Sequence, residues 1–257
     1  MRGLLQRLRR HREQRAVERR AIPDPLWQLT LARYPFLARL GTADQAELRR
    51  LSSLFLDHKE FSGAHGLELT DDMAVAIAAQ ACLPVLRLGL QPYDGFVGIV
   101  VHSDEVQVRR EYVDDDGIVH EYDDVLAGEA MEGGPVMLSW RDVSEAGDSA
   151  DWGYNVVIHE FAHVIDMGDG LADGIPPLPG TDERMRWKTV LDQEYGSFCR
   201  RVDADQDTVL DPYGAESPEE FFAVASEAFF VAPQALRDEH PQLYALLAGF
   251  YRQDPAG

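Results

Sequence analysis

The sequence lacks the features that mark secreted, membrane-spanning and disulfide-rich proteins. It contains only two cysteines, Cys82 and Cys199, so we expect small buried side chains there and no disulfide framework. No run of 18 apolar residues occurs, so no transmembrane helix is expected. The N-terminus has arginines without the apolar segment of a secretory signal. These absences predict a soluble cytoplasmic protein with no membrane partner.

Positive charge is also scarce. Lys and Arg together number 24 against 45 Asp and Glu, and the net charge is −21. Eight of the arginines lie within residues 1–20, so the rest of the chain is more acidic still. Such a body repels phosphate backbones, and we therefore expect no direct binding of nucleic acid. For the basic segment we favour a solvated or frayed helix over contact with an anionic surface.

The length of 257 residues allows one large domain. We expect a basic leader at residues 1–22, followed by a single domain at 23–257. The part of that domain up to residue 140 mixes helices and short strands, and the part at 150–257 is helical. No internal repeat or convincing interdomain linker is present.

Helical periodicity and capping signals mark several segments. Thr42 and Gln45 form a capping-box pattern at the start of one helix. Another is expected after Thr70, and Pro84 should stop it. Later helices are expected from Thr181 and over residues 217–231 and 241–251.

Strand-like runs fill the region between these helices, at residues 95–101, 106–113, 118–126 and 133–140. The run Asp114-Asp115-Asp116-Gly117 is typical of a solvated hairpin turn, since it lacks the alternating ligands of a calcium loop. Two glycines and Pro135 in the last run indicate an edge strand. Whether such an edge pairs with an extended peptide or is an ordinary sheet edge stays open.

One stretch carries a recognisable chemistry. Residues 155–166 follow a helical pattern and contain His159-Glu160-Phe161-Ala162-His163. Residues four apart lie on the same helix face, so His159 and His163 can bind one zinc ion. Glu160 then lies beside the metal, where it can take a proton from the attacking water. The alternative is a chance match on a buried helix, which composition makes uncommon.

A zinc hydrolase normally has three protein ligands, so a third is needed. Glu220 is the main candidate, at the third position of a helix that Ser217 caps and Pro218 opens. The same position allows Glu220 a purely structural role in a capping box. Glu227 lies seven residues later on the same face, as a rival ligand or as a partner of a ligand. Spacing does not decide between these roles.

The motif at 159–163, followed by Tyr213 and Glu220 seven residues apart, resembles the Mlc titration factor A family of zinc peptidases. The catalytic domain of anthrax lethal factor is similar in the same two segments. The likeness to the family covers most of the chain outside the basic leader. It includes Leu83-Pro84-Val85-Leu86, Asp94-Gly95-Phe96, Gly153-Tyr154-Asn155 and Ser226-Glu227.

The resemblance implies an α+β, zincin-like metallopeptidase, mostly helical, with a small mixed sheet beside the motif helix. It implies that His159, His163 and Glu220 hold zinc, that Glu160 is the catalytic base and that Tyr213 lies near the metal. From its position, Tyr213 can equally be a turn aromatic packed on the next helix. Asp166, three residues after His163, is a candidate to orient an imidazole or else a surface aspartate near a helix end.

The implied function is a zinc-dependent peptidase, aminopeptidase-like, that acts on a peptide or protein substrate. Because the family's founding member binds the glucose repressor Mlc, the resemblance also implies an Mlc-like repressor as a partner. The acidic body favours a basic partner of that kind. The alternative is a non-catalytic regulator that sequesters a repressor and uses zinc structurally.

Overall fold

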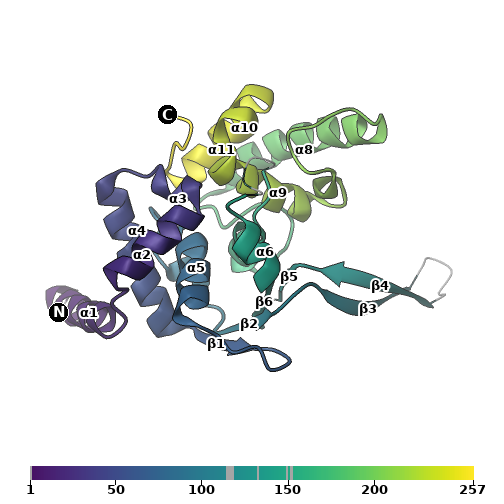
Figure 1. The fold of residues 1–257 in the computed structure, drawn as a ribbon. Helices are drawn as coiled ribbons and strands as arrows, with labels where there is room; N and C mark the ends of the chain where they lie inside the picture. The colour runs from purple at the N-terminus through teal and green to yellow at the C-terminus, as the bar shows by residue number, and fades with distance from the viewer. Residues whose placement is uncertain (1, 114–118, 132, 149, 151–152) are drawn as a thin grey trace.

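The computed structural model describes residues 2–113, 119–131, 133–148, 150 and 153–257. In these residues the fold is α+β and mostly helical, with one mixed sheet of four strands and a separate two-stranded hairpin (Figure 1). None of their helices combines the length and the apolar character that crossing a membrane requires.

The first part of the chain is a group of helices. They are α1 (Arg2–Arg19), α2 (Asp24–Arg33), α3 (Pro35–Ala38), α4 (Thr42–His58) and α5 (Asp71–Cys82). Helix α1 contacts α4, where Ala16 is buried and Arg19 lies 2.9 Å from Asp57 in an ion pair. The separation of residues 1–22 from one domain at 23–257 stays a prediction.

The predicted starts of α4 and α5 are confirmed, but one predicted cap is wrong. Thr70 caps α5 by accepting a hydrogen bond from the backbone N–H of Met73. The N-cap of α4 is Gly41, without a side-chain hydrogen bond. Gln45 donates instead to backbone carbonyls before the helix, so the capping box expected at Thr42 does not form.

The four-stranded sheet has the order β1-β2-β6-β5. Strands β1 (Glu60–Gly63), β2 (Gly98–His102) and β6 (Val136–Ser139) run parallel, whereas β5 (Gly128–Ala130) pairs antiparallel with β6. The strand expected at 133–140 is therefore β6, and its assignment as an edge is wrong. Pro135 precedes the strand, so it removes no hydrogen bond from within it. The edge strand next to β6 is β5, which the sequence patterns did not reveal, and the other edge strand is β1.

The predicted pair of strands at 106–113 and 118–126 is confirmed as an antiparallel hairpin. It consists of β3 (Val106–Val113) and β4 (Val119–Leu126), with Val106 opposite Leu126 and Val113 opposite Val119. The hairpin extends away from the rest of the molecule (Figure 1). The turn expected at Asp114–Gly117 lies outside the described residues.

The second half of the chain is helical. Its α-helices are α6 (Trp140–Glu145), α7 (Val156–Asp166), α8 (Thr181–Asp203), α9 (Pro218–Val231), α10 (Pro233–Glu239) and α11 (Pro241–Tyr251). This half also has the short 3-10 turns η3 (Met167–Asp169) and η4 (Pro212–Ala215), and a further one, η1 (Gln91–Tyr93), precedes β2 in the first half. Helices α8 to α11 gather on one side of the molecule, opposite α1 to α4 (Figure 1).

An aromatic cluster packs against one face of helix α7, the face opposite the two histidines. Phe161 is fully buried, and its ring centroid lies 4.9 Å from that of Tyr93, 5.6 Å from that of Phe55 and 5.8 Å from that of Phe96. Aromatic pairs at these distances stabilise a core beyond the area that they bury. The cluster fixes one face of α7 and leaves the opposite face, with His159 and His163, to pack against α9.

Candidate metal centre

The motif helix begins where the sequence predicts. Asn155 is the N-cap of α7, and its side-chain oxygen accepts a 2.9 Å hydrogen bond from the backbone N–H of Ile158. The same side chain donates to Gln80 on α5 at 2.8 Å. Asn155 therefore fixes both the start of α7 and its position against α5, and this sets the direction in which the two histidines point.

Helix α9 brings the third group. As predicted, Ser217 is the N-cap, Pro218 opens the helix, and the Ser217 hydroxyl accepts a hydrogen bond from the backbone N–H of Glu220. From Phe221 to Val231 every residue of α9 is buried, so the helix is rigidly packed. The side chain of Glu220 therefore projects from a fixed helix end toward α7.

Three groups from the two helices converge. The Nε2 atoms of His159 and His163 lie 3.1 Å apart. Oε2 of Glu220 lies 3.0 Å from Nε2 of His159 and 3.3 Å from Nε2 of His163. Within the described part of the chain, these residues form a group whose donor atoms all lie within 4.8 Å of one another.

Glu227 lies behind this group. Its Oε1 is 2.7 Å from Nδ1 of His159, and its Oε2 accepts a hydrogen bond from the backbone N–H of Asn155. Because Nδ1 and Nε2 point to different sides of an imidazole, Glu227 contacts the side that faces away from Glu220. A carboxylate at Nδ1 favours the tautomer that is protonated there, which leaves the lone pair of Nε2 directed at the other donors.

The two glutamates of α9 differ in their pKa. Burial opposes ionisation of Glu220, but its hydrogen bonds to His159 and His163 lower its pKa to about 2. Burial raises the pKa of Glu227, against the opposing effect of His159. Burial would lower the pKa of His159, yet Glu227 and Glu220 together raise it well above its usual value. The site therefore concentrates negative charge around two imidazoles.

Glu160 is nearly enclosed. Only 5% of the residue is exposed, and burial raises its pKa to about 7, although His159 and His163 oppose the shift. Its carboxyl group lies against the backbone of Gly128 on β5, where an added Cβ would come within 2.5 Å of Oε1. Glycine at 128 thus makes room for Glu160 beside the edge strand. No sequence pattern pointed to this contact.

The two remaining predicted residues are Tyr213 and Asp166, of which the first is exposed and the second is buried. Tyr213, on η4, lies with its ring centroid 6.0 Å from that of His159 and is 44% exposed. Asp166 is buried, and its Oδ2 accepts a 2.8 Å hydrogen bond from the backbone N–H of Gly174. Of the two places expected for Asp166, the one at the surface is therefore wrong, and its hydrogen bond to Gly174 anchors the loop after α7. The carboxylate that contacts Nδ1 of His159 is that of Glu227.

The donor set suits a metal ion. Two imidazole nitrogens and one carboxylate oxygen are the ligands that divalent transition metals, zinc among them, take in proteins. The His159 ring is already oriented by a carboxylate, as metal-binding histidines usually are. The convergence of His159, His163 and Glu220 agrees with the ligand set predicted from the sequence, but their role as ligands stays a prediction.

Comparison with known proteins gives a consistent result. The model of the glucose-regulated metallo-peptidase M90 family matches residues 8–252. The match begins inside the basic segment, which we expected to lie outside the likeness. "Uncharacterized protein slr2042" of Synechocystis is 40% identical over 235 residues, covering 90% of this chain and 85% of that protein.

Proteins named Mlc titration factor A are also similar to this chain. The one from Edwardsiella ictaluri is 39% identical over 224 residues, covering 86% of this chain and 85% of its own length. The one from Salmonella arizonae is 36% identical over 236 residues, covering 91% of this chain and 92% of its own. The similarity therefore extends over nearly the whole length of each protein.

Proposed function

The chain belongs to the glucose-regulated metallo-peptidase M90 family, and we propose that it is a zinc-dependent peptidase with a zincin-like active site. The observation that carries the proposal is the meeting of His159, His163 and Glu220, whose donor atoms lie within 4.8 Å of one another. These three residues would hold the ion. When bound, zinc supplies a Lewis acid that polarises a carbonyl and lowers the pKa of water.

Glu160 is the proposed general base. Its side chain follows His159 directly in the motif, and its pKa of about 7 suits proton exchange near neutral pH. Burial between α7 and β5 holds the carboxyl group in place. Glu160 would take the proton from the attacking water and deliver it to the leaving amine. Tyr213, beside His159, would donate a hydrogen bond to the developing oxyanion.

The open edge of β5 gives the substrate a place to bind. Of the four strands of the sheet, β5 is the outermost on the side of Glu160, and its Gly128 contacts that side chain. An extended peptide can add to such an edge as a further strand. This arrangement supports a peptide or protein as substrate. Aminopeptidase activity is proposed on the resemblance to the family alone.

The proposal is tested with Glu160→Gln, which keeps the shape of the side chain and removes the base. We expect hydrolysis of an aminoacyl reporter to fall by roughly 100- to 10,000-fold, with zinc content unchanged. Glu219→Gln, a partly exposed neighbour of Glu220 on α9, is the control and should leave activity within about twofold. Wild-type turnover by Glu160→Gln would contradict the enzyme assignment.

A regulatory role is supported by the name of the relatives, Mlc titration factor A. We propose that this chain also binds an Mlc-like repressor in the cytoplasm, and that its net charge of −21 favours a basic partner. Glu160→Gln should bind such a repressor as the wild type does, because the substitution leaves the surface unchanged. If the zinc-loaded wild type bound the repressor but hydrolysed no peptide, the protein would be a regulator in which zinc has a structural role and no catalytic one.

A further inference from the structure

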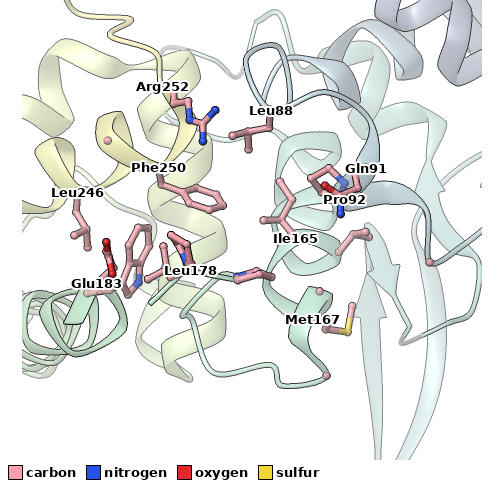
Figure 2. A pocket seen from close by; sticks show the side chains of 18 of the residues that line it. Leu88, Gln91, Pro92, Ile165, Met167, Leu178, Glu183, Leu246, Phe250 and Arg252 are labelled. Atoms are coloured by element: carbon pink, nitrogen blue, oxygen red, sulfur yellow. The ribbon is translucent and has the colours of Figure 1, made fainter. Parts of the chain in front are cut away.

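A large groove lies beyond the C-terminal end of α7. It has a volume of about 1110 Å³ and runs between α7 and the segment before β2 on one side and α8 and α11 on the other. Figure 2 shows Leu246 and Phe250 on one wall and Ile165 and Pro92 on the other, with Leu178 between them. We call it the apolar groove, lined among others by Met131, Val164, Met167, Leu178, Leu246 and Phe250.

The walls of the apolar groove are suited to an apolar guest. Val164, Met167, Leu178 and Phe250 are each only half-buried, so their apolar surface remains open to the cavity. Its volume is slightly above the roughly 300–1,000 Å³ of typical small-molecule pockets, so it has room for side chains of a peptide. The charged residues that line it, Arg186 among them, are exposed. A bulky apolar side chain would therefore bind better on these walls than a charged one.

The apolar groove and the candidate metal centre lie along the same helix, since Val164 and Ile165 of α7 line the groove and follow His163 directly. Val164 follows Glu160 by four residues on the same face of α7, and Met167 follows by seven residues at the C-cap of the helix. At a rise of 1.5 Å per residue, the two groove residues lie about 6 and about 10 Å beyond Glu160 along the helix axis.

Strand β5 also extends from Glu160 toward the apolar groove. Gly128 of β5 contacts Glu160, and Met131, three residues later, lines the apolar groove. Three residues of strand span about 10 Å. Along both α7 and β5, the groove therefore begins about 6 to 10 Å from Glu160. This distance equals two or three residues of an extended peptide.

We propose that the apolar groove selects the substrate: peptides with a bulky apolar side chain two or three residues from the bond that is cut. The inference rests on the proposed peptidase function and adds the substrate class. A single-residue reporter ends before the groove, whereas a longer peptide paired with β5 enters it. Burying a leucine or phenylalanine side chain there should improve binding by about tenfold or more.

Gly249 offers a way to block the groove. It lies on α11 at the groove wall, and an added Cβ would meet no atom within 4 Å. Gly249→Phe is therefore expected to place an aromatic side chain at the groove wall, where its Cβ has space, and replacing a helical glycine does not weaken the helix. Gln242→Phe is the matched control, since Gln242 is exposed on the same helix and does not line the groove.

The experiment compares hexapeptide reporters that carry leucine or glycine at the second or third residue after the first peptide bond, which is the bond that an aminopeptidase cuts. Of the leucine peptides, the one that is cleaved faster should have a kcat/KM about tenfold above that of the glycine peptide, both with the wild type and with Gln242→Phe. Gly249→Phe should lose this preference and still cleave an aminoacyl reporter within about twofold of the wild type. A preference that survives in Gly249→Phe, or is absent in the wild type, overturns the proposal.

A binding measurement keeps this test separate from the enzyme assignment. Calorimetry with the Glu160→Gln protein, with and without Gly249→Phe, measures the affinity for the same uncleaved peptides. The leucine peptide should bind about tenfold more weakly once Gly249 is replaced, and the glycine peptide should not change. If no peptide is cleaved but this difference appears, the peptidase proposal fails and the groove assignment stands. Equal affinities for both peptides, or no binding, overturn the groove assignment.

Discussion

Two positions of helix α9, one at its N-terminal end and one two turns further on, carry the same residue type in contrasting surroundings. At the N-terminal end, Glu220 lies at the opening of the site, faces both imidazole Nε2 atoms and has its pKa lowered to about 2. Two turns later, Glu227 is buried against Nδ1 of His159 and the backbone of Asn155, and burial raises its pKa. Because they are seven residues apart, both carboxylates lie on the helix face toward His159. Their different burial therefore distinguishes the role of Glu220 from that of Glu227.

This contrast assigns Glu220 to binding an ion and Glu227 to positioning a ligand. A carboxylate that stays ionised and borders two ring nitrogens is suited to be a metal ligand. A buried carboxylate behind one ring fixes its orientation and tautomer. Each role predicts a different result when the glutamate is replaced.

The largest effect is expected from Glu220→Ala. Removing one of three protein ligands should weaken zinc binding by more than about 100-fold, because loss of a ligand exceeds the roughly 10- to 100-fold effect of outer partners. Zinc content after dialysis against a chelator measures it. Glu219→Ala, one residue away, is the control. If Glu220→Ala retained zinc at the wild-type level, the assignment of Glu220 as a zinc ligand would be wrong.

A smaller effect is expected from Glu227→Gln. The amide keeps the shape of the side chain but weakens the hold on Nδ1 of His159, so zinc affinity should fall by about 10- to 100-fold. Competition with a chelator of known affinity gives the value. The comparison with Glu220→Ala is decisive: if Glu227→Gln alone lost the metal, Glu227 would be the ligand and Glu220 the outer group.

The smallest effect concerns stability against pH in protein stripped of metal. Glu220 has a lowered pKa, so its contribution to stability is present above its usual value of 4.5 and is lost as pH falls toward about 2. Glu227 has a raised pKa, so its contribution is present below 4.5 and is lost as pH rises through the folded-state value.

Urea unfolding between about pH 3 and pH 8 measures this difference. As pH rises, Glu220→Gln should lose stability relative to the wild type, and Glu227→Gln should gain it. Trends of the same sign in both variants would show that the two carboxylates sit in equivalent environments.

Much of the site could be predicted from the sequence because it depends on local rules. Helical spacing places His159 and His163 on one face, and Ser217 with Pro218 defines the start of α9. The choice between Glu220 and Glu227 could not be made from spacing, since both lie on the same face. It required the packing of α9 against α7, which sequence periodicity does not contain.

The sheet was harder to predict for a physical reason. Strand β5 has three residues and β6 has four, too few for an alternating pattern to identify their neighbours. Pro135 predicts an edge strand, yet it stands just outside β6 and does not affect pairing. The contact between Gly128 and Glu160, and the apolar groove beyond it, arise from tertiary packing alone.

The central claim is that one zinc ion lies between α7 and α9. Anomalous diffraction at the zinc edge, from crystals of the zinc-loaded protein, tests it most directly. The account predicts one strong peak at about 2.0–2.2 Å from Nε2 of His159, Nε2 of His163 and a carboxylate oxygen of Glu220. A peak bound by Glu227 instead, or no peak between the two histidines, would contradict it.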